Sequence, residues 1–423
     1  MRYFFFIALF LITFRSNAQK SVGINFEENL SWAQVKEKAK KENKYIFLDG
    51  YTTWCVPCRE MAKNIFPLEE VGTFFNNSFI SVAVQFDVTD NDNKFVKAWY
   101  KDAKMLHETY KVDSYPTYLF LSPDGNLVHY FKGGSRTGAE FISKAKLALK
   151  PESQYLNLKL QYQLGKRDSI FLVDLIRTAT ESNDIAVYTF INEYLSKQKN
   201  RLTPQNLKFV SRATTKRTDP GFDIVKNHQG LLDSVAGKGR GREILKTIAF
   251  DEIVLPFING KKTVYGGGMV IYSGDLVKNV NWDKLKKKLD LEYPEVSDQV
   301  ILIAKPLYYQ MLGDWSNFCS SVSLYAADTV NLSKHDLEVY ARTVFLSCDD
   351  QNSVKEAIKW SEQLLLLADK TKPGYLSTYS ELLYKSGEKA RAIKSMKEYV
   401  TFAPADDYAQ KQLEKMKGDE KIW

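Results

Sequence analysis

Apolar runs of strand length alternate with amphipathic stretches of helix length over about the first 150 residues of the chain. Residues 31–42 are expected to form a helix because their apolar side chains share one face: Trp32, Val35 and Ala39. Ser31 stands three residues before Gln34, which is the spacing of a capping box. The chain therefore begins its folded part with a capped helix.

After this helix the pattern alternates strands with helices and then changes to a hairpin. Pro67 interrupts one helix, and Ser122-Pro123-Asp124-Gly125 places Pro and Gly where a turn needs them. The predicted elements are a strand over 45–48, helices over 55–66 and on toward Phe75, a strand over 80–88, a helix over 95–110, strands over 118–121 and 127–131, and a helix to about Leu149.

Two thiols stand three positions apart in the run Trp54-Cys55-Val56-Pro57-Cys58, between the first strand and its helix. Such a pair is typical of a reversible disulfide. A structural zinc site would need four ligands, usually from two such pairs or from a matching pair of histidines. The chain has four Cys without a second pair of this spacing, and its four His are scattered. The pattern predicts redox chemistry and no metal site.

Position assigns the two thiols different roles. Cys55 is expected at the N-terminal end of its helix, where unpaired N–H groups and the helix dipole favour a thiolate. Cys55 is therefore the predicted nucleophile. Cys58, one turn along the helix, is the predicted resolving thiol that closes the Cys55–Cys58 bond.

The element order and three local markers resemble the thioredoxin family over about residues 26–149. Trp54 precedes the first Cys, Asp49 lies six residues before it, and Tyr115-Pro116-Thr117 is similar to the cis-proline loop. The flanks also resemble the C-terminal periplasmic domain of the transmembrane disulfide reductases, in which Val often stands where Val56 does. The resemblance implies an α/β thioredoxin fold, a central mixed sheet flanked by helices.

The resemblance implies that Asp49 is a buried acid that accepts the proton of Cys58, directly or through water. A turn residue at the end of the strand is the alternative for Asp49. Ala83 departs from the family, because by counting it stands where thioredoxins carry a buried Lys beside the acid. This departure puts the family's detailed proton chemistry in doubt here.

Three further residues are implied at the site. Pro116 would follow a cis peptide bond that holds the backbone of Tyr115 beside the sulfurs, where it could pair with an extended client segment. A plain proline at the start of a strand is the alternative. Trp54 would form an apolar wall next to the first Cys, or serve in ordinary core packing.

From Pro151 onward the strand signals largely vanish and amphipathic helical segments dominate, so we expect a mostly α-helical, repeat-like C-terminal region. The expected parts are a thioredoxin-like domain at 19–150, a helical region with Gly-rich connectors at 151–300, and a helical region at 301–423. The last resembles tetratricopeptide helix pairs, because Ala357-Ile358 and Ala392-Ile393 lie 35 positions apart.

Glycines interrupt the helical pattern at several places. Two stretches are Gly-rich, 237–242 and 266–268, and neither has the strand, loop and helix context of a phosphate cradle. We expect a mobile connector at the first and a bent hairpin at the second. Similar turns that hint at degenerate repeats occur at Leu164-Gly165-Lys166, Leu312-Gly313-Asp314 and Ser386-Gly387-Glu388.

The other two cysteines, Cys319 and Cys348, fall in the helical region. In an exported protein they could form a disulfide. On consecutive antiparallel helices that turn near Val330 they would be offset by roughly 10 Å, at about 1.5 Å per residue, which exceeds the reach of a disulfide. The register therefore favours buried free thiols.

The first 18 residues have the pattern of a secretory signal peptide. Arg2 precedes an apolar stretch over 3–14, and Ser16-Asn17-Ala18 offers small residues for cleavage after Ala18. The stretch is about twelve residues long and a bilayer span needs roughly 20. We expect an exported, periplasmic protein without a membrane span after cleavage, with a retained leader as the alternative.

The formal charge of +8 becomes +6 without Arg2 and Arg15. Acidic and basic residues are interspersed, so this charge does not indicate a nucleic-acid partner.

Two classes of function follow. The first is an exported thiol-disulfide oxidoreductase without a cofactor, with disulfide-containing clients and a separate thiol electron donor such as a membrane disulfide reductase. The second is a helical-repeat adaptor of the cell envelope whose dithiol is incidental.

Overall fold

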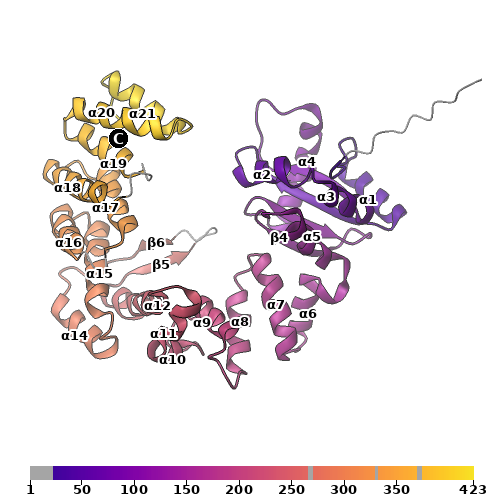
Figure 1. Ribbon diagram of the computed structural model, residues 1–423, viewed down its shortest axis with the longest axis horizontal. Coiled ribbons are helices and arrows are strands. Elements are labelled where there is room, and N and C mark those ends of the chain that lie inside the picture. The colour runs from indigo at the N-terminus through magenta and orange to yellow at the C-terminus, as the bar shows by residue number, and fades with distance from the viewer. Residues whose placement is uncertain (1–21, 265–269, 329–331, 369–373) are drawn as a thin grey trace, which may run out of the picture. The chain divides into compact units, whose positions relative to one another are not determined.

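A computed structural model describes residues 22–264, 270–328, 332–368 and 374–423. The chain divides into two compact units, one up to Gln198 and one from Lys199. The expected leader and the glycines at 266–268 lie outside the described residues. Figure 1 follows the chain from the N-terminus through both units.

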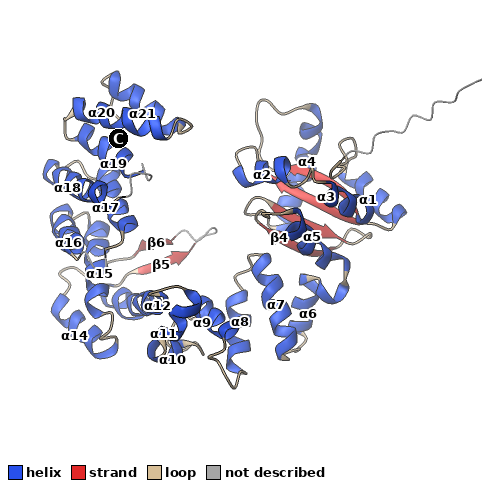
Figure 2. Ribbon diagram, in the orientation of Figure 1, coloured by secondary structure: helices blue, strands red, loops and turns tan. Residues whose placement is uncertain are grey.

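The first unit is built on a mixed sheet of four strands (Figure 2). The strands are β1 (Tyr45–Tyr51), β2 (Phe79–Gln85), β3 (Thr117–Leu121) and β4 (Leu127–Lys132). Their order is β2-β1-β3-β4, with β1 parallel to β2 and antiparallel to β3, and β3 antiparallel to β4. The predicted α/β thioredoxin fold with a central mixed sheet is confirmed.

Helices cover both faces of this sheet, because successive strand residues point to opposite faces. Ile46 and Leu48 of β1 pack with α1 (Trp32–Glu42) and α4 (Lys94–Tyr110). Phe47 packs on the opposite face with three helices: α2 (Val56–Asn64), α3 (Glu69–Ser78) and α5 (Gly138–Lys146). Both β1 faces are therefore buried.

Local signals set the first helix as expected. The Ser31 hydroxyl accepts a hydrogen bond from the Gln34 N–H, the Gln34 side chain accepts from the Ser31 N–H, and the predicted capping box is confirmed. Asn43 ends the helix in the left-handed conformation with φ of 50°. Ser31 and Asn43 thus determine where the chain enters and leaves α1.

The first unit continues past residue 150 into three more helices, α6 (Tyr155–Gln163), α7 (Ser169–Glu181) and α8 (Val187–Ser196). Helices α6 and α7 pack against β4. The Tyr155 N–H donates to Nδ1 of buried His129 on β4 at 3.1 Å, and the Ser182 hydroxyl donates to the Tyr130 carbonyl at 2.7 Å. These bonds join the start of the helical region to the sheet.

The second unit is mostly helical. Its helices are α9 (Pro204–Ala213), α10 (Phe222–Asn227), α11 (Gln229–Ala236), α12 (Arg240–Ala249), the π-helical η3 (Phe250–Val254), α13 (Leu255–Ile258), α14 (Trp282–Glu292), α15 (Ser297–Leu312), α16 (Trp315–Ala327), α17 (Lys334–Ser347), α18 (Gln351–Leu367), α19 (Gly374–Lys385), α20 (Lys389–Phe402) and α21 (Asp407–Lys417). A two-stranded hairpin, β5 (Lys261–Val264) and β6 (Val270–Ser273), interrupts them.

The last helices pack in sequence, α17 on α18, α18 on α19, and α19 on α20, around a common core. Ala357 of α18 and Ala392 of α20 are both buried in that core. Gly165, Gly313 and Gly387 all have positive φ between two helices, as predicted for turns. The predicted mostly helical C-terminal region is therefore confirmed, and its repeat character stays a prediction.

The two Gly-rich stretches differ from each other. The expected hairpin is present as β5 and β6. The first stretch is a short turn between α11 and α12, because the Asp233 carboxylate accepts from the N–H groups of Gly239 and Gly241 at 2.6 and 2.9 Å. The stretch connects two helices, as expected, and its end at Gly241 already belongs to α12.

Cys319 on α16 and Cys348 at the end of α17 are buried and free, as the register argument predicted. Burial raises the pKa of Cys319 to about 11, so this thiol is held in its neutral form. Among the described residues we find no helix with the length and apolar character needed to cross a membrane.

Candidate functional site

The dithiol lies between the end of β1 and the start of α2. Cys55 is the N-cap residue of α2, and its Sγ accepts the N–H of Cys58 at 3.1 Å. Cys55 and Cys58 form a disulfide. Their side chains are little exposed in this form, with 2% and 7% of each residue accessible. The helix N-terminus that was predicted to favour a thiolate thus contacts the sulfur of Cys55 directly.

Asp49 lies inside β1, on the same face of the sheet as α2, and only 6% of it is exposed. Burial raises the pKa of Asp49 to about 7, because desolvation disfavours the carboxylate. Asp49 is opposite Ala83 in the parallel pairing of β1 with β2 and opposite Tyr118 in the pairing with β3. The strand pairing therefore places Ala83, which stands where thioredoxins carry a Lys, next to the buried acid.

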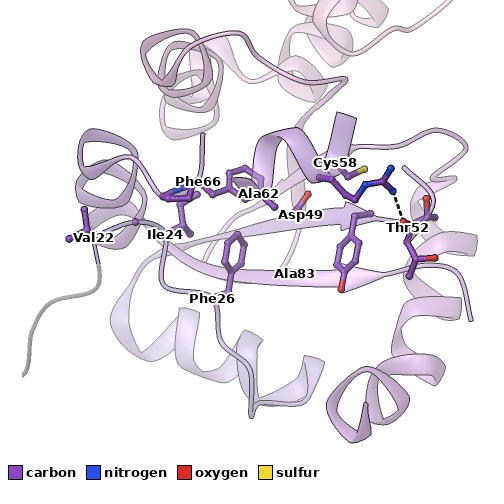
Figure 3. A pocket seen from close by; sticks show the side chains of 14 residues that line it. Val22, Ile24, Phe26, Asp49, Thr52, Cys58, Ala62, Phe66 and Ala83 are labelled. Carbon is purple, nitrogen blue, oxygen red and sulfur yellow. Dashed lines mark hydrogen bonds between the residues drawn. The ribbon is translucent and has the colours of Figure 1, made fainter. Parts of the chain in front are cut away.

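A cavity of about 870 Å³ lies beside the dithiol and contains both Asp49 and Cys58 in its lining (Figure 3). Ala83, opposite Asp49, also lines the cavity, and the cationic side chain in the lining is that of Arg59 on α2. Much of the remaining wall is apolar: Val22, Ile24, Phe26, Ala62 and Phe66. The cavity thus joins the resolving thiol and the buried carboxyl in one largely apolar space.

The loop before β3 completes the site. The Tyr115–Pro116 peptide bond is cis. The ring of Tyr115 packs edge to face against Trp54, with ring centroids 5.9 Å apart. Trp54 is 67% exposed, so it contributes to the surface next to the dithiol and little to the core. Sequence-distant Trp54 and Tyr115 thus form one aromatic surface.

Two residues that the sequence did not single out hold the loop before Cys55. The Asp87 carboxylate accepts the Thr53 N–H at 3.0 Å and also bonds the Thr53 hydroxyl. The Arg59 guanidinium donates to the Thr53 carbonyl at 2.8 Å. Asp87 is 34 residues from Thr53, so no local pattern could have connected them. Among the described residues, no three His, Cys, Asp or Glu side chains are grouped as a metal site would need.

Residues 32–148 match the family model of the thioredoxin-like domain. Thioredoxin-1 of Drosophila melanogaster is 34% identical over 89 residues, which are 21% of this chain and 67% of that protein. The chain belongs to the thioredoxin-like family. The match covers the elements from α1 to α5 and the dithiol between them.

Other relatives of this thioredoxin-like chain are larger proteins. The thiol:disulfide interchange protein DsbD of Colwellia psychrerythraea is 30% identical over 139 residues, which are 32% of this chain and 21% of DsbD. The chain thus spans about a fifth of the length of DsbD. Among solved structures, a DsbH oxidoreductase is 24% identical and covers 34% of this chain and 94% of its own, with a TM-score of 0.26. The family and the Cys55–Cys58 pair together support thiol-disulfide oxidoreductase chemistry.

Proposed function

We propose that the protein is an exported thiol-disulfide oxidoreductase that reduces or exchanges disulfides in proteins of the cell envelope. The observation that carries the proposal is the contact of Cys55 Sγ with the Cys58 N–H in the first turn of α2, beside a cavity that contains Cys58 and Asp49. The relationship to DsbD supports an envelope location, and the leader pattern before Ala18 agrees with export.

The first step is attack on a client disulfide. In the reduced protein, the N–H groups at the start of α2 stabilise the Cys55 thiolate. The thiolate attacks one client sulfur, the client disulfide breaks, and the second client sulfur leaves as a thiolate that takes up a proton. The product is a mixed disulfide between Cys55 and the client.

The second step releases the client. The Cys58 thiol transfers its proton to Asp49, whose raised pKa of about 7 suits it to accept a proton near neutral pH. The Cys58 thiolate then attacks the Cys55 sulfur, the mixed disulfide breaks, and the client leaves with both of its sulfurs reduced. Two electrons have passed from the dithiol to the client, and a separate dithiol donor must reduce Cys55–Cys58 again.

The surface of Trp54 and Tyr115 supports a place for the client. Tyr115 presents its backbone at the start of the cis-proline loop, and an extended client segment would pair with that backbone. Trp54, exposed and packed on Tyr115, supplies an apolar contact. Main-chain pairing accepts many side chains, which suits an enzyme that acts on disulfides of different proteins.

Insulin reduction by the full mature chain tests the enzyme against the adaptor. We expect catalysed reduction in the presence of dithiothreitol, and its loss in Cys55→Ser. Cys348→Ser, which removes a buried thiol far along the chain, is the matched control and should retain activity. Equal activity of wild type and Cys55→Ser would support the helical-repeat adaptor instead.

A Cys58→Ser trap identifies clients. Without the resolving thiol, Cys55 should accumulate disulfide-linked clients in envelope extracts, and mass spectrometry would name them. An empty trap would contradict exchange with proteins. The direction of exchange is tested by the reduction potential of Cys55–Cys58, since a value at or above about −120 mV would indicate an oxidant.

A further inference from the structure

The second unit contains an open groove of about 610 Å³ that has no part in the thiol chemistry, and we call it the α15 groove. Four helical elements and one strand line it. Their lining residues are Glu243, Lys246 and Thr247 of α12, Phe250 and Asp251 of η3, Ile303, Leu307, Gln310 and Met311 of α15, Asp336, Val339 and Tyr340 of α17, and Val270, Ile271 and Tyr272 of β6. The volume lies within the range of about 300–1,000 Å³ that ligand pockets show.

The floor of the α15 groove is an apolar stripe of one helix. Ile303, Leu307 and Met311 follow each other at intervals of four residues, so they share one face of α15. All three are half-buried, because no other element covers this face completely. Val339 on α17 continues the apolar surface and is 46% exposed. The groove thus presents apolar contacts to whatever enters it.

One wall of the α15 groove is the outer edge of β6. Val270, Ile271 and Tyr272 are consecutive, and consecutive strand residues point to opposite faces, so a groove that all three line runs along the strand edge. The hairpin has only two strands, and β6 pairs with β5 on its other side. Among the described residues no hydrogen bond occupies the outer edge of β6. An edge of this kind accepts a further strand.

Contacts hold this edge in place. The Tyr272 ring packs edge to face on Phe250, with centroids 5.8 Å apart. Lys262 on β5 makes an ion pair with Asp251 at 2.6 Å. The hairpin is therefore attached to η3 on the same side as the groove.

The charge of the α15 groove favours a cationic ligand. Its lining includes the carboxylates of Glu243, Asp251 and Asp336. Glu243 pairs with Lys246 and Asp251 pairs with Lys262, each at 2.6 Å, so the excess negative charge is that of Asp336. Aromatic rings in the lining also attract cations. This acidic groove lies in a chain whose formal charge is +8.

We propose that the α15 groove binds an extended polypeptide segment in which apolar residues alternate with Lys or Arg. The segment lies along β6 as a third strand, places its apolar side chains on the stripe of α15, and directs a cation to the carboxylate of Asp336. Because the groove contains neither Cys55 nor Cys58, this binding does not depend on the proposed redox function. The acidic lining repels phosphates, which argues against a nucleic-acid ligand.

The test uses the full mature chain and labelled six-residue peptides in fluorescence anisotropy. A peptide of alternating Val and Lys should bind, and the matched peptide of Val and Glu should bind at least about tenfold more weakly because its charge is reversed. Two further peptides carry N-methyl groups on alternate backbone nitrogens, one on its Val residues and the other on its Lys residues. One of the two should lose binding, since it lacks the N–H groups that pair with β6. Added salt should weaken binding.

Two variants of one residue supply matched controls. Val339→Arg places a cation in the α15 groove and should weaken the Val-Lys peptide about tenfold, whereas Val339→Glu should not weaken it. Leu366→Arg also replaces an exposed aliphatic side chain by Arg, at an 87% exposed position of α18 outside the groove, and should not change peptide binding. A Cys55→Ser, Cys58→Ser double variant should bind the peptide as wild type does.

These results separate the two proposals. Loss of insulin reduction with unchanged peptide binding in the double variant supports binding that is independent of the thiols. No measurable binding of the Val-Lys peptide, equal binding of both peptides, or equal effects of Val339→Arg and Leu366→Arg would overturn the α15 groove as a peptide site and leave the redox proposal intact.

Discussion

Replacement of Asp49 by Asn should raise the free energy of unfolding of the first unit, and the increase should grow with pH. The pKa of Asp49 is about 7 in the folded protein because burial disfavours its charge. An Asp in an unfolded chain titrates near pH 3.9, so the unfolded state loses this proton first as the pH rises. The folded state of the wild type is therefore destabilised between about pH 4 and pH 7.

The magnitude follows from the difference between the two pKa values. About three pKa units at 1.36 kcal/mol each give a penalty of about 4 kcal/mol above pH 7. Of this, about 2–3 kcal/mol develops between pH 5 and pH 8. The Asn side chain is similar in shape to the protonated acid and stays neutral at all these pH values, so Asp49→Asn avoids the penalty.

The assay is urea-induced unfolding of the oxidised full chain at pH 5 and pH 8, followed by hydrogen exchange of peptides from β1 and β3. These peptides report the first unit alone. Asp90→Asn, which changes an exposed carboxylate of the same unit, is the control and should show no such difference between the two pH values. Taking the difference from wild type cancels the titration of all other groups.

An equal stability difference between Asp49→Asn and wild type at pH 5 and pH 8 would contradict the raised pKa of Asp49. A second readout is kinetic. If Asp49 accepts the Cys58 proton, Asp49→Asn should release a client from its mixed disulfide with Cys55 more slowly than wild type at neutral pH. This defect should diminish at high pH, where Cys58 ionises without Asp49.

Three further predictions concern other parts of the chain. Burial lowers the pKa of His129 to about 3, so the folded state keeps this ring neutral while the unfolded state binds a proton below about pH 6.5. The free energy of unfolding therefore falls as the pH falls from about 6.5 toward 3. His129→Gln should weaken this loss, as measured by urea unfolding between pH 6.5 and pH 4. In the reduced native protein Cys319 and Cys348 should resist alkylation while Cys55 reacts as a thiolate, and counting labelled thiols by mass before and after denaturation checks this. Labelling of Cys319 and Cys348 as fast as that of Cys55 in the native state would contradict this difference. Gly72→Ala would place a Cβ 2.3 Å from the Gly23 carbonyl oxygen, so it should lower the melting temperature of the first unit by several degrees at a cost of about 1–3 kcal/mol, and an unchanged melting temperature would be inconsistent with this close approach.

The sequence alone predicted the elements up to about residue 149 because their signals are local. The capping box of α1, the turn between β3 and β4 and the break at Pro67 each depend on residues within a few positions of one another. The dithiol at the start of a helix is equally local, since Cys55 caps the helix that carries Cys58. Patterns of this range can be read without knowing how distant segments meet.

The tertiary structure decided which distant residues share a site. Only the strand register places Ala83 opposite Asp49, only folding brings Asp87 to Thr53, and only packing buries Asp49 enough to shift its pKa. The helices at 151–198 join the first unit for the same reason, because α6 and α7 pack on β4 and α8 packs on α7.

The α15 groove is the clearest example of a site that only the tertiary structure forms. Its four walls come from segments between Glu243 and Tyr340, and none of them has a motif that indicates binding. Hydrophobic periodicity tells which face of a helix is apolar, but not whether a neighbour covers it. The thiol pair Cys55 and Cys58 is thus evident from residues close together in the sequence, whereas the surfaces that receive a partner form only after separate segments have packed together.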